Sequence, residues 1–286
     1  MNAHKTRLPF RRRLFSLLKW LSIGMTVISV IALLSIIVYV FADGIDKLSL
    51  HLLFGAYTED APSILPALVG TLELVLIAGI IAVPLGIGSA VFLVEYTDNT
   101  GILVRMIRIA TETLAGIPSI VYGLFGYLVF VVALKWKYTL LGGGITLAVM
   151  ILPVIVRATE ESLLAVPVAY REGAFALGAG KVRTIFCVVL PAAAGGIVTA
   201  VILSIGRVIS ESAVLILTVG MVVNRIPSTV LSPGTSLALD IYYFASHGHP
   251  REAAATAVVL LVLVRLLNLA AGAAGKLIRK SQGVNK

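Results

Sequence analysis

The sequence predicts an all-α, polytopic membrane protein with six membrane-spanning helices, and three observations support this fold class. Of the 286 residues 59% are hydrophobic and only 13% are charged, with a mean hydropathy of +1.03, whereas a soluble domain is nearer half apolar and a quarter charged. The apolar residues form long continuous runs, unlike the short alternating segments of a membrane barrel. Because backbone polar groups in lipid must be bonded within their own segment, such runs are expected to be helices.

Six apolar stretches approach or exceed the roughly 20 residues that cross a bilayer. They lie at residues 17–41, 64–94, 109–134, 141–156, 192–222 and 253–274. The second contains Pro84 and several glycines, the fourth is short and opens with a Gly-Gly-Gly turn, and the fifth is interrupted by charge. The small residues at 86–90 and 195–200 are expected to let helices approach closely rather than to bind a substrate.

The distribution of Lys and Arg predicts that both termini are cytoplasmic. An even number of spans places the two termini on one side, and the loops and tails of that side hold sixteen Lys and Arg against five on the other. Basic residues collect on the cytoplasmic side of a membrane. The net charge of +9 is therefore attributed to membrane topology and not to nucleic-acid binding.

Three parts of the chain follow from this topology. Residues 1–63 are a basic N-terminal segment, the first span and an acidic outer loop; residues 64–275 are the main membrane domain with a cytoplasmic loop at 158–191; and residues 276–286 are a basic cytoplasmic tail. The first span is too long for a typical signal-peptide core and is expected to be retained. The lone Cys187 allows no internal disulfide, and the four histidines suggest no metal site.

The segment from Arg171 to Pro191 interrupts the apolar pattern with glycines and charges. Tyr170, Ala174 and Leu177 are spaced four and three apart and so share one face of a short helix. Gly178 and Gly180 then end it, because glycine adopts the left-handed cap without steric cost. A second helix begins near Lys181 and leads into Pro191. The small residues Gly173 and Ala174 are expected to be exposed, so that the first helix can fit a groove on a partner protein.

Other classes of protein fit the sequence poorly. The stretch GAGKV at 178–182 is not a phosphate loop, because Phe175 stands where that motif needs Gly and Val182 where it needs Ser or Thr. An intramembrane protease would need paired catalytic residues within the spans, which contain neither His nor Asp. A selectivity ring for an ion channel is not apparent either. The chain is therefore expected to carry out no chemistry of its own.

Two intramembrane residues are candidates for a substrate path. Arg207 and Glu211 are four apart and are expected on one face of the fifth span. Arg207 lies sixteen positions after Pro191, or roughly 24 Å along a helix, which places it deep in the bilayer, where a charge is costly. The pair either holds helices in register or forms an anion site, since the arginine fork matches phosphate and carboxylate oxygens. Arg157 either extends to the interface or lies on the same path.

The cytoplasmic segment resembles the coupling loop of ABC-importer permeases, whose pattern is E-A-A-x3-G-x9-I-x-L-P. The matching residues are Glu172, Gly173, Ala174, Gly178, Val188, Leu190 and Pro191. Gly173 replaces Ala and Val188 replaces Ile, and both keep the small or branched apolar character. The resemblance implies a MetI-like permease architecture in which the short helix docks into a cleft of a separate cytoplasmic ATPase subunit.

Two further stretches, 114–126 and 206–220, closely resemble phosphate-importer permeases of the PstA type. This implies a subunit of a bacterial cell-membrane importer of inorganic phosphate, embedded in lipid. The implied partners are a sister permease of the PstC type, two copies of an ATP-binding subunit of the PstB type and an extracytoplasmic phosphate-binding protein of the PstS type. It also implicates Arg207 and Glu211 in phosphate passage. Sulfate, molybdate or phosphonate remain alternative substrates, because the coupling loop does not separate them.

Overall fold

A computed structural model describes residues 7–59, 61–97 and 101–281, and every regular element in those ranges is helical. The membrane-length helices are α1 (Arg7–Gly44), α3 (Leu65–Val91), α6 (Leu140–Leu164), α9 (Leu190–Ile209) and α12 (Pro250–Ser281). The shorter α-helices are α2 (Leu50–Phe54), α4 (Ile102–Ala115), α5 (Ser119–Gly126), α7 (Val168–Ala176), α8 (Lys181–Thr184), α10 (Ala213–Thr218) and α11 (Leu237–Ser246). Three π-helical segments, η2 (Phe92–Tyr96), η3 (Tyr127–Ala133) and η4 (Ile185–Val189), and the 3-10 turn η1 (Ile45–Lys47) extend or join them.

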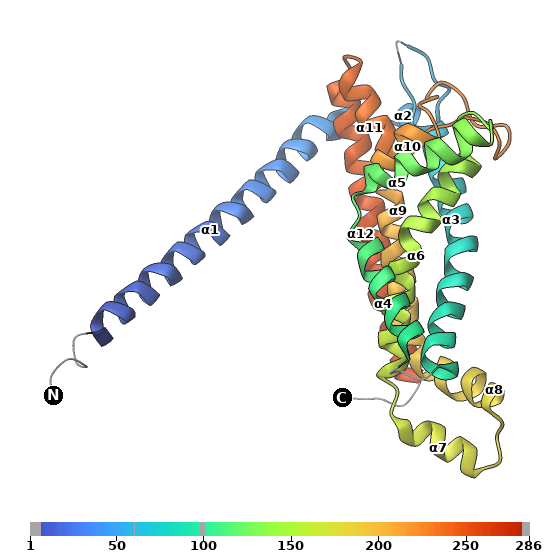
Figure 1. Cartoon of the computed structure of the whole chain (residues 1–286). Helices are drawn as coiled ribbons and strands as arrows, with labels where there is room; N and C mark the ends of the chain where they lie inside the picture. Colours follow the sequence, from blue (N-terminus) through green and yellow to red (C-terminus); the bar gives the residue numbers. More distant parts are fainter. Residues whose placement is uncertain (1–6, 60, 98–100, 282–286) are drawn as a thin grey trace.

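The long helices except α1 form one bundle (Figure 1). Within it α3 packs along α6, and α9 packs along both α6 and α12. The helices α7 and α8 protrude at one end, called here the α7 end, and α2, α10 and α11 lie at the opposite, α11 end. The described ends of α1 and α12 both point toward the α7 end, which agrees with an even number of spans.

Helix α1 leans away from the bundle and touches it only near the α11 end, where it contacts α12 (Figure 1). The membrane-length part of α1 is apolar, and none of it is buried against the rest of the chain. An apolar helix of this kind needs lipid or a second protein around it. The fold therefore leaves the membrane-length part of α1 available for contacts outside this subunit.

The count of six spans is confirmed when a bent helix pair is taken as one span, since five further segments are long and apolar enough to cross a membrane. The prediction that residues 109–134 form a single straight span is wrong. The chain bends by 99° between α4 and the α5–η3 segment. Pro118 causes the break, because it lacks an N–H and pushes the preceding Ile117 out of helical geometry.

The prediction of one continuous span over 192–222 is also wrong. Helix α9 ends at Ile209, three residues follow outside any helix, and α10 begins at Ala213. The hydroxyl of Ser210 donates back to the Gly206 carbonyl at 3.1 Å. Side-chain hydrogen bonds of this kind compete with the helical ladder, so the sequence Ser-Glu-Ser favours an end to the helix here.

Glycines at 142–144 do not form the expected turn before the fourth span; they lie inside α6, which starts from the cap of Thr139 on the Gly142 N–H at 3.0 Å. Their role is close packing. A Cβ on Gly143 would lie 2.2 Å from Val219 Cγ2, and one on Gly144 would lie 2.5 Å from Ile77 Cγ2. Small residues let membrane helices approach each other in this way.

The packing role predicted for the other small-residue stretches is confirmed at two positions. A Cβ on Gly86 would lie 2.6 Å from Ile155 Cγ2, and one on Gly196 would lie 2.4 Å from the Ser162 hydroxyl. The central core that results is built from buried side chains of α3, α6 and α10. Its members include Leu74, Leu147, Ile151, Val214 and Leu215. This core holds the bundle rigid around the breaks in α4–α5 and α9–α10.

A buried carboxyl group near the α11 end gives a testable pH dependence. Asp240 is 0% exposed in α11, and its Oδ1 accepts the Thr235 hydroxyl while Oδ2 has no partner among the described residues. Burial raises the pKa of Asp240 from 3.8 to about 8. Below pH 3.8 the carboxyl group is protonated in the folded and in the unfolded chain, and its contribution to stability is complete. As the pH rises toward 8, only the unfolded chain loses the proton, so the folded state loses stability.

We expect Asp240→Asn to remove this pH dependence, since the amide keeps the shape and stays neutral. Between pH 3.8 and about 8 the wild-type free energy of unfolding should fall, relative to that of the variant, by at most ~1.4 kcal/mol per pH unit. Thermal unfolding of the purified chain in detergent from pH 5 to pH 9 measures this. Asp46→Asn, at an exposed position near the same end, is the control and should follow the wild type. If the free energy of unfolding changed with pH equally in the wild type and in Asp240→Asn, the pH dependence would not come from Asp240.

Candidate functional site

The two breaks in the helices lie close together. Helix α10, which follows the second break, packs against α5, which follows the first. The contact is tight, because a Cβ on Gly123 would lie 3.0 Å from Val214 Cα. Tyr122 of α5, Val208 of α9 and Val214 of α10 also belong to one buried core cluster. The stretches 114–126 and 206–220, which are far apart in the sequence, therefore meet at one place in the bundle.

Arg207 lies in the last turn of α9 and is exposed on the surface of this chain. Within the described ranges it forms no ion pair or hydrogen bond with another residue. It stands 17 residues beyond the start of α9, or about 26 Å along the helix axis. The carbonyl end of a helix favours a cation, which partly compensates the charge. No residue in the described part of the chain binds its guanidinium donors, which can therefore bind a ligand or a partner subunit.

Glu211 does not pair with Arg207, so the predicted pairing on one helix face is wrong. The reason is that α9 ends at Ile209, between the two residues. Glu211 Oε1 instead accepts the backbone N–H of Ala213 at 3.1 Å and caps the start of α10. The structure thus separates the two charges, although both remain beside the same break.

Tyr122 is a residue of this region that the sequence did not reveal as functional. Its hydroxyl donates to the Leu114 carbonyl at 2.8 Å, across the bend between α4 and α5. The same carbonyl also accepts the Ile117 N–H at 3.1 Å, so the Tyr122 hydroxyl adds a second bond at the end of α4. Its only sequence signal was its place in the 114–126 stretch. Tyr122 therefore fixes the bend and packs in the same core cluster as Val208, the neighbour of Arg207.

Arg157 lies in a network of charges between α4 and α6. Its Nη1 donates to Glu112 Oε1 at 2.9 Å and its Nε to Glu161 Oε1 at 3.2 Å. Beside it Arg108 binds Glu160 Oε1 at 2.6 Å. Arg157 is therefore compensated by carboxylates of its own chain, whereas no carboxylate among the described residues pairs with Arg207. The sequence could not place Glu112 beside Arg157 or Arg108 beside Glu160, which are 45 and 52 residues apart, although the Arg157–Glu161 pair at a spacing of four was open to prediction.

The predicted helix–turn–helix elbow is confirmed as α7 and α8. Gly178 ends α7 with a φ of +81°, which side chains rarely adopt. The Ala179 N–H donates to the Ala174 carbonyl at 3.0 Å, and the Gly178 N–H donates to the Phe175 carbonyl at 2.9 Å. This is the Schellman pattern of helix ends. Gly180 caps the start of α8 instead of helping to end α7.

The faces of α7 differ in part from the prediction. Gly173 is exposed, with no atom within 4 Å of an added Cβ, and Glu172 is exposed beside it. Ala174 was expected on the surface but is only 9% exposed, and α7 packs against η4 and α8. Tyr170 and Leu177 are 50% and 89% exposed and so do not share its buried face. An exposed apolar surface around a glycine suits a protein partner. Leu190 and Pro191 form the first turn of α9 behind the elbow.

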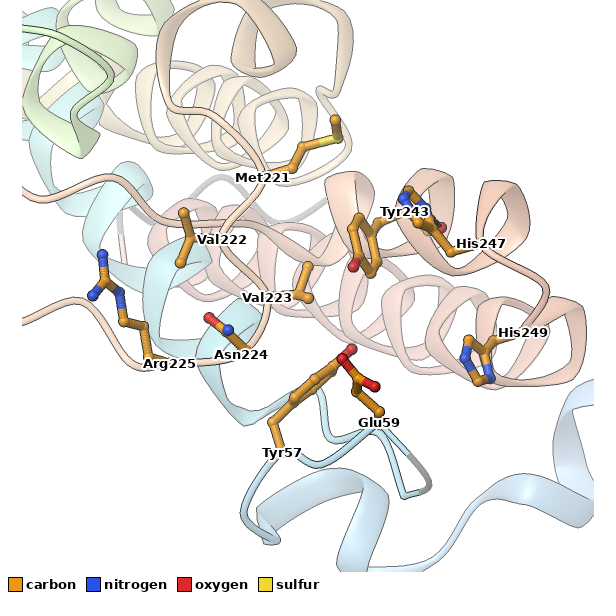
Figure 2. Close-up of a pocket in the computed structure, with 10 residues that line it drawn as sticks. All are labelled: Tyr57, Glu59, Met221, Val222, Val223, Asn224, Arg225, Tyr243, His247 and His249. Atoms are coloured by element: carbon orange, nitrogen blue, oxygen red, sulfur yellow. Dashed lines mark hydrogen bonds between the residues drawn. The ribbon is translucent and has the colours of Figure 1, made fainter.

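A hollow of about 540 Å³ opens at the α11 end (Figure 2). Its lining comes from the loop between α2 and α3, the loop after α10 and the end of α11. Figure 2 shows Arg225 at one side and His249 at the other, with Glu59 between them in this view. His247 stacks on Tyr243 with ring centroids 4.0 Å apart. Among the described residues no group of His, Cys, Asp and Glu could hold a metal ion.

The fold is that of an ABC-transporter permease. Over 73% of this chain and 93% of the other, it superposes on a chain of the MetNI methionine ABC transporter in an inward-facing conformation, with a TM-score of 0.61 and 21% identity. Over 88% and 92% it superposes on a chain of a bacterial alginate ABC transporter, with a TM-score of 0.64 and 15% identity.

The chain belongs to the binding-protein-dependent transport system inner membrane component family, whose pattern matches residues 82–282. It is 34% identical to the probable ABC transporter permease YqgI of Bacillus subtilis, over 86% of this chain and 90% of the relative. It is 36% identical to the phosphate transport system permease PstA 1 of Mycobacterium tuberculosis, over 77% and 73%. With PstA of Yersinia pestis it shares 33% identity over 95% and 93%. It is thus a multi-pass inner-membrane permease component.

Proposed function

We propose that this chain is the transmembrane permease subunit of an ATP-driven importer of inorganic phosphate. The observation that carries the proposal is the exposed guanidinium of Arg207, beside two adjoining helix breaks and without a partner among the described residues. Arginine presents a fork of donors that matches phosphate oxygens. The identity to relatives named phosphate permeases, 36% and 33%, supports phosphate over other oxyanions.

The exposed surfaces support three kinds of partner. Helix α1 and the Arg207 face are left open by this chain, which fits a sister permease; the chain is also 33% identical to the phosphate permease PstC 1 of Mycobacterium bovis over 72% of its length. The α7 surface fits a cytoplasmic ATP-binding subunit, present in two copies. The polar hollow at the α11 end fits an extracytoplasmic phosphate-binding protein.

In this proposal the α7 end and both termini lie in the cytoplasm of a bacterial cell. Residues 1–63 then supply the first span and an outer loop, residues 64–275 the permease domain with the coupling loop at 158–191, and residues 276–286 a tail whose last five residues lie outside the described structure. ATP hydrolysis belongs to the separate subunit, and this chain performs none. The excess of basic residues at the α7 end supports the orientation.

Phosphate would cross between this chain and its sister. At the paired breaks Arg207 donates to the anion, Tyr122 holds the bend, and Glu211 fixes the start of α10, so that the site keeps its shape without a tight cage. Nearer the α7 end Arg157 would exchange one of its carboxylate partners for the passing anion. An arginine that already has carboxylate partners binds an anion weakly, which suits a transporter that must release its cargo.

Uptake of radiolabelled phosphate tests the proposal. Cells that lack their own high-affinity phosphate importer would express this chain together with its three partners, and membrane levels of each chain would be measured. We expect phosphate uptake that a large excess of sulfate does not reduce. Uptake of sulfate, molybdate or phosphonate in place of phosphate, by a correctly assembled complex, would contradict the proposal and move the substrate to another oxyanion.

A further inference from the structure

Arg171 in α7 points back into the bundle, while its neighbour Glu172 is exposed. Its Nε and Nη2 donate to Glu95 Oε1 at 3.0 and 2.7 Å. The two side chains are only 16% and 10% exposed. Glu95 belongs to η2, the segment that ends the α3 span, and lies 76 residues away in the sequence. A salt bridge this well shielded from water is screened far less than a surface pair.

The same guanidinium also binds the end of α6. Its Nη1 donates to the Val166 carbonyl at 3.0 Å and its Nη2 to the Leu163 carbonyl at 3.1 Å. The last carbonyls of a helix have no partner within the helix and favour a cation. One side chain of α7 therefore joins the ends of both α3 and α6, the two helices that pack along each other in the core.

A second contact ties the elbow to the same segment. The Lys181 ammonium of α8 lies 4.9 Å from the centre of the Tyr96 ring, a cation–π contact. Tyr96 directly follows Glu95 in η2. Both helices of the elbow are thus attached to adjacent residues at the end of α3. By contrast, the covalent links of α7 are short turns on either side, at 165–167 and 177–180.

We propose that Arg171 is a positioning residue for energy coupling: its bonds to Glu95, Leu163 and Val166 transmit a displacement of α7 to the ends of α3 and α6. The inference rests on the proposed function, because it assumes that the ATP-binding subunit moves α7. Without these bonds α7 would turn about its flanking turns and leave α3 behind. ATP would then be hydrolysed with little movement of the membrane helices.

The test uses proteoliposomes that contain the complete transporter. For each variant the number of phosphate ions transported per ATP hydrolysed is measured. Arg171→Gln and Glu95→Gln should each lower this ratio about tenfold while subunit assembly and ATP hydrolysis stay within about twofold of the wild type, a change typical of lost coupling between two sites. Arg171→Lys keeps the charge but cannot reach the carboxylate and both carbonyls, so an intermediate ratio is expected.

Arg105→Gln is the matched control, since it removes one exposed positive charge at the same end of the bundle and should leave the ratio unchanged. A wild-type ratio in both Gln variants, or an equal fall in Arg105→Gln, would overturn the proposal. If the wild-type complex hydrolyses ATP but moves no phosphate, the proposed function fails instead. Hydrogen exchange of α7 and η2 needs no substrate and then decides the inference alone: faster exchange in Arg171→Gln supports it, and unchanged exchange refutes it.

Discussion

Arg207→Gln is expected to lower the initial rate of phosphate uptake by the assembled transporter about a hundredfold, because charged hydrogen bonds to an anion contribute up to about 3 kcal/mol each. The glutamine side chain can still donate one or two hydrogen bonds but carries no charge. The exposed position of Arg207, without a partner among the described residues, means that the fold of this chain does not depend on it. Uptake into proteoliposomes at fixed ATP, with subunit assembly measured in parallel, gives the result.

Two further variants separate charge from geometry. Arg207→Lys keeps the charge but loses the fork, and a loss of about tenfold is expected because a lysine binds phosphate as a point charge. Arg265→Gln removes another exposed arginine, in the middle of α12, and should leave uptake near the wild-type rate. Full uptake by Arg207→Gln at normal assembly would make Arg207 a structural residue and remove it from the path.

The second large effect is expected from Gly173→Trp in the elbow. No atom lies within 4 Å of a Cβ added at this glycine, so this chain can accommodate the larger side chain. A partner whose groove fits a glycine cannot, because close-packed interfaces tolerate little added volume. Binding of the ATP-binding subunit should therefore weaken at least about tenfold, as for a residue at the centre of an interface. Co-purification of the two subunits, and ATP-driven uptake, measure this.

Gly272→Trp provides the control for that substitution. Gly272 also has open space around its Cβ position, but it lies in α12 and not in the elbow. The variant should co-purify with the ATP-binding subunit as the wild type does. If Gly173→Trp also co-purified normally and supported uptake, α7 would not be the docking helix, and the proposed coupling role of residues 172–178 would be wrong.

The sequence predicted those features that depend on composition or on local chemistry. Long apolar runs predicted the spans, and the spacing of the glycines predicted the elbow, because the left-handed cap at Gly178 is a local property of the chain. The breaks were missed for a physical reason. Apolar residues continue on both sides of Pro118, and the polar residues at 207–212 were interpreted as charges within one span, so the apolar runs predicted neither break. Pro118 alone could have indicated the first break.

The remaining differences arise from tertiary contacts. The sequence could not place Glu112 beside Arg157 or Glu95 beside Arg171, since those partners are 45 and 76 residues away. It also predicted that Ala174 is exposed, because the packing of α7 against η4 and α8 is a tertiary contact that helical periodicity does not show. The pairing of Arg207 with Glu211 failed for a related reason, as the expected helix does not reach Glu211.

The most direct test of the account is accumulation of phosphate in proteoliposomes made from this chain, its sister permease and the ATP-binding subunit, with purified phosphate-binding protein outside and ATP within. The account predicts that phosphate accumulates only when both ATP and the binding protein are present, and that a large excess of sulfate does not reduce it. Normal ATP hydrolysis without phosphate accumulation, or accumulation of sulfate in its place, would contradict it.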